Sequence, residues 1–139
     1  MLKIFLIDNL TETGNNLKSV IQNCEGVEFI GQSKRGLAGI QIINEHRPDV
    51  VLIDLNISGT NGFDLLSWIK ENYPNTKVIM ISNTIKVEYR LISESLGADF
   101  FIDMQTEMDT LTTIIKSISL FHNQNKEKEI INVIKENRK

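Results

Sequence analysis

The run Val50-Val51-Leu52-Ile53-Asp54-Leu55-Asn56 decides the fold, together with the turn-rich residues 58–62 that follow it. Four successive apolar residues are typical of a strand that is buried on both faces, as in a parallel sheet. Open α/β sheets bind ligands just outside the carboxyl ends of such strands, and Asp54 stands at that end. Asp is also a common turn former after a strand, so the rest of the chain must decide what Asp54 does.

The composition indicates one globular domain. The chain has 139 residues, of which 41% are hydrophobic and 24% charged, as in ordinary folded domains. A net charge of −3 argues against a direct nucleic-acid partner. The single cysteine, Cys24, excludes an intramolecular disulfide, and its spacing from Leu17 and Ile21 favours a core residue of a helix. We find neither a signal peptide nor an apolar stretch that could cross a bilayer, and expect a cytoplasmic protein without membrane contact.

Strand-like and helix-like segments alternate five times along the chain. The predicted strands are the apolar runs at residues 4–7, 27–30, 50–53, 78–81 and 100–102. Between them, apolar residues recur three and four positions apart, as on the buried face of a helix. Val87, Leu91 and Ile92 mark the fourth helix in this way. The alternation indicates right-handed βαβ units, and hence an α/β fold with a doubly wound parallel sheet covered on both faces.

The last residues, 122–139, differ in character from the domain at residues 1–121. A charged run is followed by Ile130, Ile131, Val133 and Ile134, which predicts a charged, helical C-terminal extension. One interpretation is a solvated continuation of the fifth helix with a few apolar residues lying on the domain. The other is a helix for dimerisation or partner docking. The small size of the aliphatic patch favours the first interpretation slightly.

Polar side chains follow most of the predicted strands. Asp8 and Asn9 follow the first, Asp54 the third, Ser82 the fourth and Asp103 the fifth. In a doubly wound sheet these positions converge on one edge. Two carboxylates and an amide oxygen are hard ligands suited to Mg²⁺. A carboxylate beside Mg²⁺ can attack phosphorus to give an acyl phosphate, and a hydroxyl can hydrogen-bond the phosphoryl group.

With these residues in place, the chain resembles the receiver domain of response regulators in two-component signal transduction. The resemblance covers about residues 2–121. The matching motifs lie at residues 6–9, 51–55, 61–62, 78–82 and 97–101. It implies the flavodoxin-like (βα)5 receiver fold, with five parallel strands in the order 2-1-3-4-5. Ser58 stands at the family's usual proline position and Asn61 at its usual aspartate position, which alters loop stiffness more than chemistry.

The resemblance also implies a phosphorylation site. Asp54 would be the phosphoacceptor. Asp8, Asn9 and Asp54, with the backbone carbonyl of Asn56, would hold Mg²⁺. Asn9 stands where the family usually has a second acidic residue, so the site loses one negative charge and we expect weak Mg²⁺ binding.

The switch residues implied by the resemblance are Ser82, the hydroxyl that moves toward the phosphoryl group, and Phe101, the aromatic ring that moves with it. Met104 stands where the family usually has a lysine that pairs with the phosphoryl group. A thioether has neither a charge nor a donor, so it cannot replace that ion pair. Lys86 could in principle reach the same space, although a lysine at the start of an exposed helix is usually solvated.

Two functions remain open. The first is a stand-alone receiver in a phosphorelay, in which a sensor histidine kinase or phosphotransfer protein phosphorylates Asp54. The face from the fourth to the fifth helix would then change its affinity for a downstream protein target. The second is a pseudo-receiver, a protein–protein interaction module that works without phosphorylation. Asp54, Asp8 and Ser82 favour the first, whereas Asn9 and Met104 favour the second. We adopt the first, expect no enzyme in the ordinary sense, and leave a homodimer open.

Overall fold

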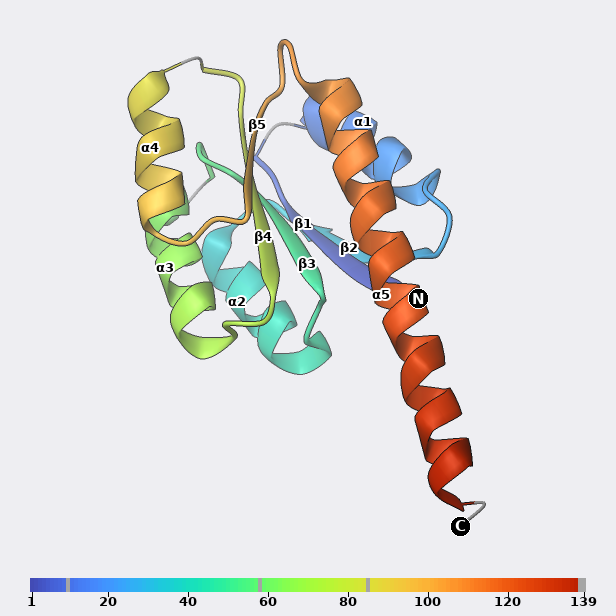
Figure 1. Ribbon diagram of the computed structural model, residues 1–139. Coiled ribbons are helices and arrows are strands. Elements are labelled where there is room, and N and C mark those ends of the chain that lie inside the picture. Colours follow the sequence, from blue (N-terminus) through green and yellow to red (C-terminus); the bar gives the residue numbers. More distant parts are fainter. Residues whose placement is uncertain (10, 58, 85, 138–139) are drawn as a thin grey trace.

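The computed structural model describes residues 1–9, 11–57, 59–84 and 86–137. Within these ranges strands and helices alternate along the chain (Figure 1). The elements are β1 (Leu2–Ile7), α1 (Thr11–Gln22), β2 (Val27–Ser33), α2 (Gly36–His46), β3 (Val50–Asp54), α3 (Gly62–Asn72), β4 (Lys77–Ser82), α4 (Val87–Ser95), β5 (Phe100–Asp103) and α5 (Met108–Asn137). Each of the five predicted strands is confirmed.

The strands form one parallel sheet in the order β2-β1-β3-β4-β5. This confirms the predicted doubly wound, flavodoxin-like fold. Ile7 of β1 pairs with Ile53 of β3, and Ser82 of β4 pairs with Asp103 of β5. The strand ends therefore meet at one edge of the sheet, as the sequence predicted.

Two hydrophobic clusters cover the two faces of the sheet because side chains alternate along each strand. One cluster joins residues such as Leu6 and Leu52 to α1 and α5. The other joins residues such as Ile7 and Ile53 to α2 and α3. Cys24 is a core residue, as predicted, since its side chain is only 5% exposed in the first cluster, but it lies two residues beyond the end of α1 rather than in the helix.

The fourth helix forms where expected, but its aliphatic residues do not face the core. Val87, Leu91 and Ile92 are exposed by 71%, 59% and 40%, and the buried side chain of the helix is Ser93. The spacing of these residues indicated a helix correctly. It could not show that the helix turns that stripe toward solvent, because this depends on how α4 docks against β5 and α3.

The fifth helix continues far beyond the sheet. It spans 30 residues, and its C-terminal half projects from the body of the domain (Figure 1). The extension is helical, as predicted, through Asn137. Its aliphatic residues do not lie on the domain, however, because Ile130 and Val133 are 60% and 56% exposed. Across the described ranges, each helix is too short or too polar to cross a membrane.

Candidate functional site

Asp8 and Asp54 lie side by side at the carboxyl end of the sheet. They directly follow the paired residues Ile7 and Ile53 on neighbouring strands. Both are buried, at 1% exposure, and the side chain of Asp8 is hydrogen-bonded to Asp54. Two ionised carboxylates this close together repel each other, so the buried arrangement disfavours ionisation of both groups at once.

Burial raises the pKa of the Asp54 carboxyl group above its ordinary value, because the charged form loses its hydration. Two hydrogen bonds act in the opposite direction without reversing the shift. The N–H of Asn56 donates to Asp54 Oδ1 over 2.9 Å, and the side chain of Asp8 supplies the second. Two ionised carboxyl groups in one buried site repel each other, and a cation between them offsets that repulsion. The pair is thus chemically suited to a cation.

The predicted metal ligands are only partly brought together. Asp8 and Asp54 are adjacent, Asn9 follows Asp8 at an exposed position, and Asn56 follows two residues after Asp54. Over the described part of the chain, no group of three or more His, Cys, Asp and Glu side chains could hold a metal ion. Mg²⁺ is often held by one or two carboxylates together with substrate phosphate and water. Two buried carboxyl groups therefore fit Mg²⁺, with fewer charges than a three-carboxylate site.

Ser82 is buried at the end of β4 and its hydroxyl is engaged in the turn that follows. Ser82 Oγ donates to the carbonyl of Thr84 and accepts from the Thr84 N–H, both over 3.0 Å. The side chain therefore acts as a turn former in this state. A move toward Asp54 would require this local pair of hydrogen bonds to break.

Met104 occupies the lysine position as a core residue. It is 9% exposed and belongs to the hydrophobic cluster that also contains Leu111 and Ile115 of α5. Lys86 does not replace the missing lysine, because its ammonium group lies over the ring of Tyr89, 5.5 Å from the ring centroid. Neither side chain brings a positive charge to the carboxyl pair.

The loop after β3 is held tightly against the start of α3. Asn61 caps the helix, since its side chain accepts a hydrogen bond from the Phe63 N–H over 2.8 Å. A Cβ on Gly62 would lie 3.0 Å from Leu55 Cα and 3.2 Å from the Asp54 carbonyl oxygen. Only glycine lets the helix come this close to the backbone that carries Asp54. Ser58, which was predicted to alter the stiffness of this loop, lies outside the described residues.

A pocket of about 490 Å³ opens beside this loop. Its lining includes Asn56 and Asn61 from the loop, Phe63 from α3 and Tyr89 from α4. The pocket exposes the backbone next to Asp54 to solvent, while the Asp54 side chain itself is buried.

The sequence profile of the response regulator receiver domain matches residues 4–116, which include every strand end described above. This chain belongs to the response regulator receiver domain family. The resemblance seen in the sequence is thereby confirmed, and the protein is a receiver of two-component signal transduction.

Individual relatives agree with this membership. The nitrate/nitrite response regulator protein homolog of Haemophilus influenzae is 29% identical over 120 residues, which cover 85% of this chain and 57% of that protein. The receiver spans about half the length of the curated relatives it matches.

Solved structures share the fold. A DNA-binding response regulator of the LuxR family from Staphylococcus aureus superposes with a TM-score of 0.78 at 18% identity, covering 86% of this chain and 99% of that one. The Mn²⁺-bound form of response regulator Rcp1 gives a TM-score of 0.70 at 19% identity, covering 87% and 94%.

The receiver also contains a cluster that sequence reasoning missed, around Phe101. The guanidinium group of Arg90 on α4 lies 5.0 Å from the centre of the Phe101 ring and donates to the Phe101 carbonyl over 3.2 Å. Its other nitrogen pairs with Glu107 over 2.6 Å, and Glu107 also accepts from the Asp103 N–H over 3.0 Å. These contacts, chiefly the Asp103 N–H and then Arg90, lower the pKa of Glu107.

The Arg90 cluster joins α4 to β5 and to the start of α5. Phe101 itself is half-buried against the core cluster beneath α2 and α3. No local spacing could have revealed the pairing of Arg90 with Glu107, since Arg90 lies on α4 and Glu107 lies 17 residues later, in the loop between β5 and α5. The cluster holds the predicted switch residue Phe101 under a charged side chain of the neighbouring helix.

Proposed function

We propose that the receiver accepts a phosphoryl group on Asp54 from a histidine kinase or phosphotransfer protein. A carboxylate oxygen of Asp54 attacks phosphorus, and the bond from phosphorus to the donor's leaving group breaks. The leaving group keeps the bonding electron pair, and Asp54 becomes an acyl phosphate. The observation that carries the proposal is the buried, hydrogen-bonded pair of Asp8 and Asp54 at the strand ends.

The residues of this chain would prepare the nucleophile in a defined way. The Asn56 N–H holds one Asp54 oxygen over 2.9 Å, which orients the carboxylate. Asp54 must be ionised to attack, and burial, which raises its pKa, opposes this. Asp8, Asp54 and the carbonyl oxygen of Asn56, with the amide oxygen of Asn9 in place of a carboxylate, would hold Mg²⁺, which would supply positive charge to the phosphoryl oxygens. Ser82 would hydrogen-bond a phosphoryl oxygen once it leaves Thr84.

The surface that responds would be the face formed by α4, β5 and the start of α5. Three observations support this. Val87 and Leu91 present aliphatic side chains to solvent on α4, as at protein-binding surfaces. Phe100 of β5, the strand that follows α4 in the chain, is 36% exposed. The Arg90 cluster links this face to Phe101, so movement of Phe101 would disturb the contacts of α4. A downstream protein target would bind here.

A pseudo-receiver is the second candidate, and Met104 favours it. A lysine at this position would be a charged donor for the phosphoryl group, whereas Met104 is packed in the core. One charge-assisted hydrogen bond contributes about 1.5–3 kcal/mol. A receiver without it would be phosphorylated slowly or only by a dedicated kinase, and its partner face could instead be used constitutively.

The decisive experiment is intact mass spectrometry after incubation with Mg²⁺ and acetyl phosphate. The expected result is a single phosphoryl adduct that is absent from the Asp54→Asn variant. A second control, Asp64→Asn on the exposed first turn of α3, should keep the adduct. Absence of any adduct with acetyl phosphate and with a panel of histidine kinases would overturn phosphorylation and leave the pseudo-receiver.

A further inference from the structure

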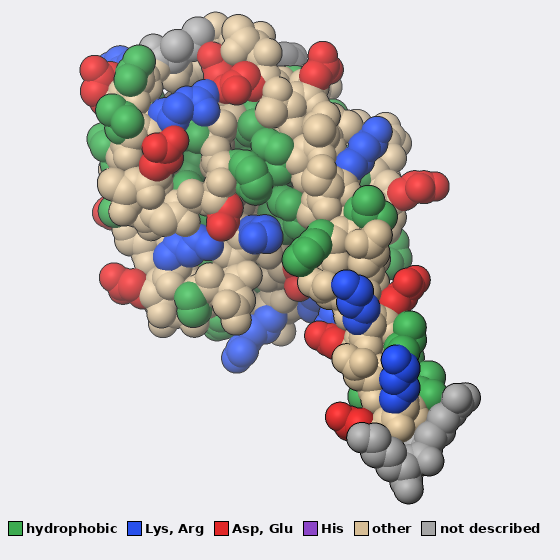
Figure 2. Space-filling view, viewed as in Figure 1, with side chains coloured by type: hydrophobic (Ala, Val, Ile, Leu, Met, Phe, Trp, Pro, Cys, Tyr) green, Lys and Arg blue, Asp and Glu red, His purple; other side chains and the backbone are tan. Residues whose placement is uncertain are grey.

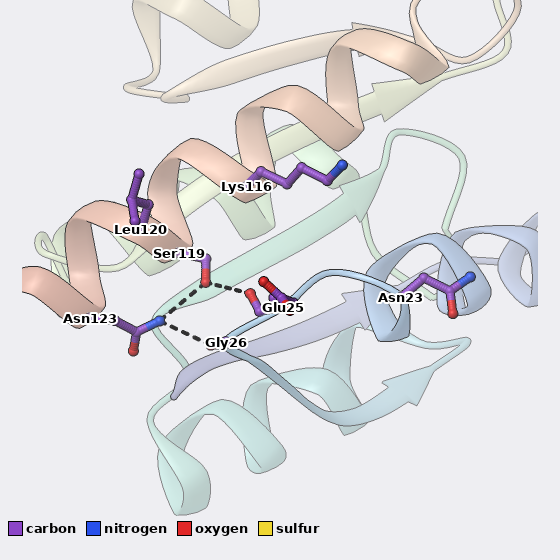
Figure 3. A pocket seen from close by; sticks show the side chains of 7 residues that line it. All are labelled: Asn23, Glu25, Gly26, Lys116, Ser119, Leu120 and Asn123. Carbon is purple, nitrogen blue, oxygen red and sulfur yellow. Dashed lines mark hydrogen bonds between the residues drawn. The ribbon is translucent and has the colours of Figure 1, made fainter.

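The domain holds α5 only as far as Asn123. Ser119 Oγ donates to the carbonyl of Glu25 over 2.9 Å, and Asn123 Nδ2 donates to the carbonyl of Gly26 over 3.4 Å (Figure 3). From residue 124 to 137 every residue of the helix is exposed. We call residues 124–137 the α5 extension. This part of the helix does not pack against the described part of the domain.

The α5 extension carries an apolar stripe. Its members are Ile130, Ile131, Val133 and Ile134, exposed by 60%, 49%, 56% and 46%. Figure 2 shows hydrophobic side chains among lysine and glutamate on this projecting segment. An unsupported helix of this length is marginal in water, and Ile and Val are not strong helix formers. The stripe is therefore the part of the molecule that would gain most from a partner.

A groove lies at the base of the same helix. It is a pocket of about 610 Å³ between the α1–β2 loop, with Glu25 and Gly26, and the α5 residues Lys116, Leu120 and Asn123 (Figure 3). Leu120 is 62% exposed at its edge. The groove thus combines an exposed leucine with one acidic and one basic side chain.

The groove and the stripe share one face of α5. Lys116, Leu120, Asn123, Ile130 and Ile134 follow one another at intervals of four, three, seven and four residues. This is the heptad spacing that lines up side chains along a helix for pairing with another helix. Leu120 and Ile130 are ten residues apart, which is about 15 Å along the axis.

We propose that a second copy of this chain packs antiparallel along α5, so that the stripe of each copy fills the groove of the other. With the twofold axis near Asn125, Ile130 of one copy meets Leu120 of the other. Ile134 then covers the aliphatic stem of Lys116, and Glu127 faces Asn123. Each copy contributes both a stripe and a groove, so the assembly closes at two chains.

The charges favour a second copy over an unrelated partner. The α5 extension has three lysines and three glutamates, so it is neutral and does not repel itself. Antiparallel packing brings Lys135 and Glu136 at one tip toward Glu25 and Lys116 of the other copy's groove. A parallel pair would set each Glu127 against its equivalent and leave both grooves empty.

The expected association is weak. Two paired helices of this length bury less than the roughly 800 Å² per partner of a standard interface. We therefore expect a dissociation constant of roughly 1–100 μM. The proposed dimer does not depend on phosphorylation of Asp54, so an experiment can contradict either one without contradicting the other.

Analytical ultracentrifugation of the chain across this concentration range tests the proposal. The wild-type chain should form dimers. Ile130→Asp combined with Ile134→Asp should weaken dimerisation at least tenfold, and so should Leu120→Asp in the groove. Leu37→Asp is the matched control, because Leu37 is 69% exposed on α2. Circular dichroism verifies that each variant keeps its helices. If the double variant loses helix, the milder Ile130→Gln replaces it in the dimerisation measurement.

Cysteine cross-linking tests the direction of packing. A mixture of Leu120→Cys and Ile130→Cys chains should form a mixed disulfide under mild oxidation. Ile130→Cys alone should not, since its two sites would be about 15 Å apart. Cys24 is buried and does not compete. A monomer at all concentrations, a dimer insensitive to the stripe, or efficient self-cross-linking of Ile130→Cys would each overturn the proposal.

Discussion

A buried carboxyl group is most stable when protonated, and Asp54 is buried against a second carboxyl group, that of Asp8. The raised pKa of Asp54 means that the folded protein binds this proton more tightly than the unfolded chain does. Stability therefore falls as pH rises from the unfolded value, about 3.9, through the raised folded value. Above that value the full cost of the buried charge is present.

Replacing Asp54 with asparagine should stabilise the metal-free protein. The amide oxygen can still accept from the Asn56 N–H, and its NH₂ group can donate to Asp8, while residue 54 carries no charge and no longer repels Asp8. We expect Tm at neutral pH to rise by a few degrees, as for about 1 kcal/mol in a domain of this size. The gain should shrink as the pH is lowered toward 4. Asp64→Asn, on the surface, should show no such pH-dependent gain; an equal gain in both variants would contradict the account.

At the lysine position, Met104→Lys should increase phosphorylation of Asp54 and decrease the stability of the folded protein. The amine would supply the missing donor at about 1.5–3 kcal/mol, which corresponds to roughly tenfold or more in the extent of phosphorylation. Removing Met104 from the core should cost about 1–3 kcal/mol of unfolding free energy. Intact mass and chemical denaturation measure the two effects. Met104→Leu should change neither by much, and a lysine variant with unchanged phosphorylation would refute this reading of the pocket.

At the scale of elements, the start of α3 is pressed against the end of β3. Gly62→Ala would place a Cβ 3.0 Å from Leu55 Cα, and the backbone would have to shift at a cost of roughly 1–3 kcal/mol. We expect lower stability and slower phosphorylation, because the shift occurs beside Asp54. Gly59→Ala is the comparison: its φ of +85° is strained for alanine, but no atom lies within 4 Å of the added Cβ. It should spare phosphorylation.

The Arg90–Glu107 pair joins α4 to the start of α5, and a double-mutant cycle with Arg90→Ala and Glu107→Ala should measure it. Both side chains are partly exposed, so solvent screening limits the coupling to about 0.5–1 kcal/mol. Because the pKa of Glu107 is lowered in the folded state, the coupling is present above about pH 4.3 and is lost as pH falls through the lowered value. Lys126–Glu129, a 3.8 Å pair on the exposed extension, should show no measurable coupling.

At the scale of the whole molecule, the boundary between the domain and its extension can be located by truncation. We expect deletion after Asn125 to leave Tm unchanged at low protein concentration, because the removed residues are exposed. Deletion after Phe121 should lower Tm, since Asn123 then no longer bonds the Gly26 carbonyl and His122 no longer lies 3.8 Å from Asp49. Equal Tm values for the two truncations would support the boundary predicted at residue 121.

The order of the elements and the position of Asp54 could be predicted because both depend on local patterns. Unbroken apolar runs mark buried parallel strands, and the polar residues that end them must meet at one edge of the sheet. The orientation of α4 could not be predicted, since Val87 and Leu91 have the spacing of a buried stripe and yet face solvent. A helix's spacing shows that it has an apolar side, and only its neighbours decide where that side points.

By itself, the sequence determined the alternating α/β architecture, the edge at which Asp8, Asp54 and Ser82 gather, and a helical tail. Tertiary structure alone decided that burial raises the pKa of Asp54, that Met104 belongs to the core, and that Arg90 of α4 pairs with Glu107 just before α5. The physical reason is range. Hydrophobic periodicity involves residues a few positions apart and can be seen in the sequence. Burial, pKa values and ion pairs depend on groups that come together only after the sheet has formed.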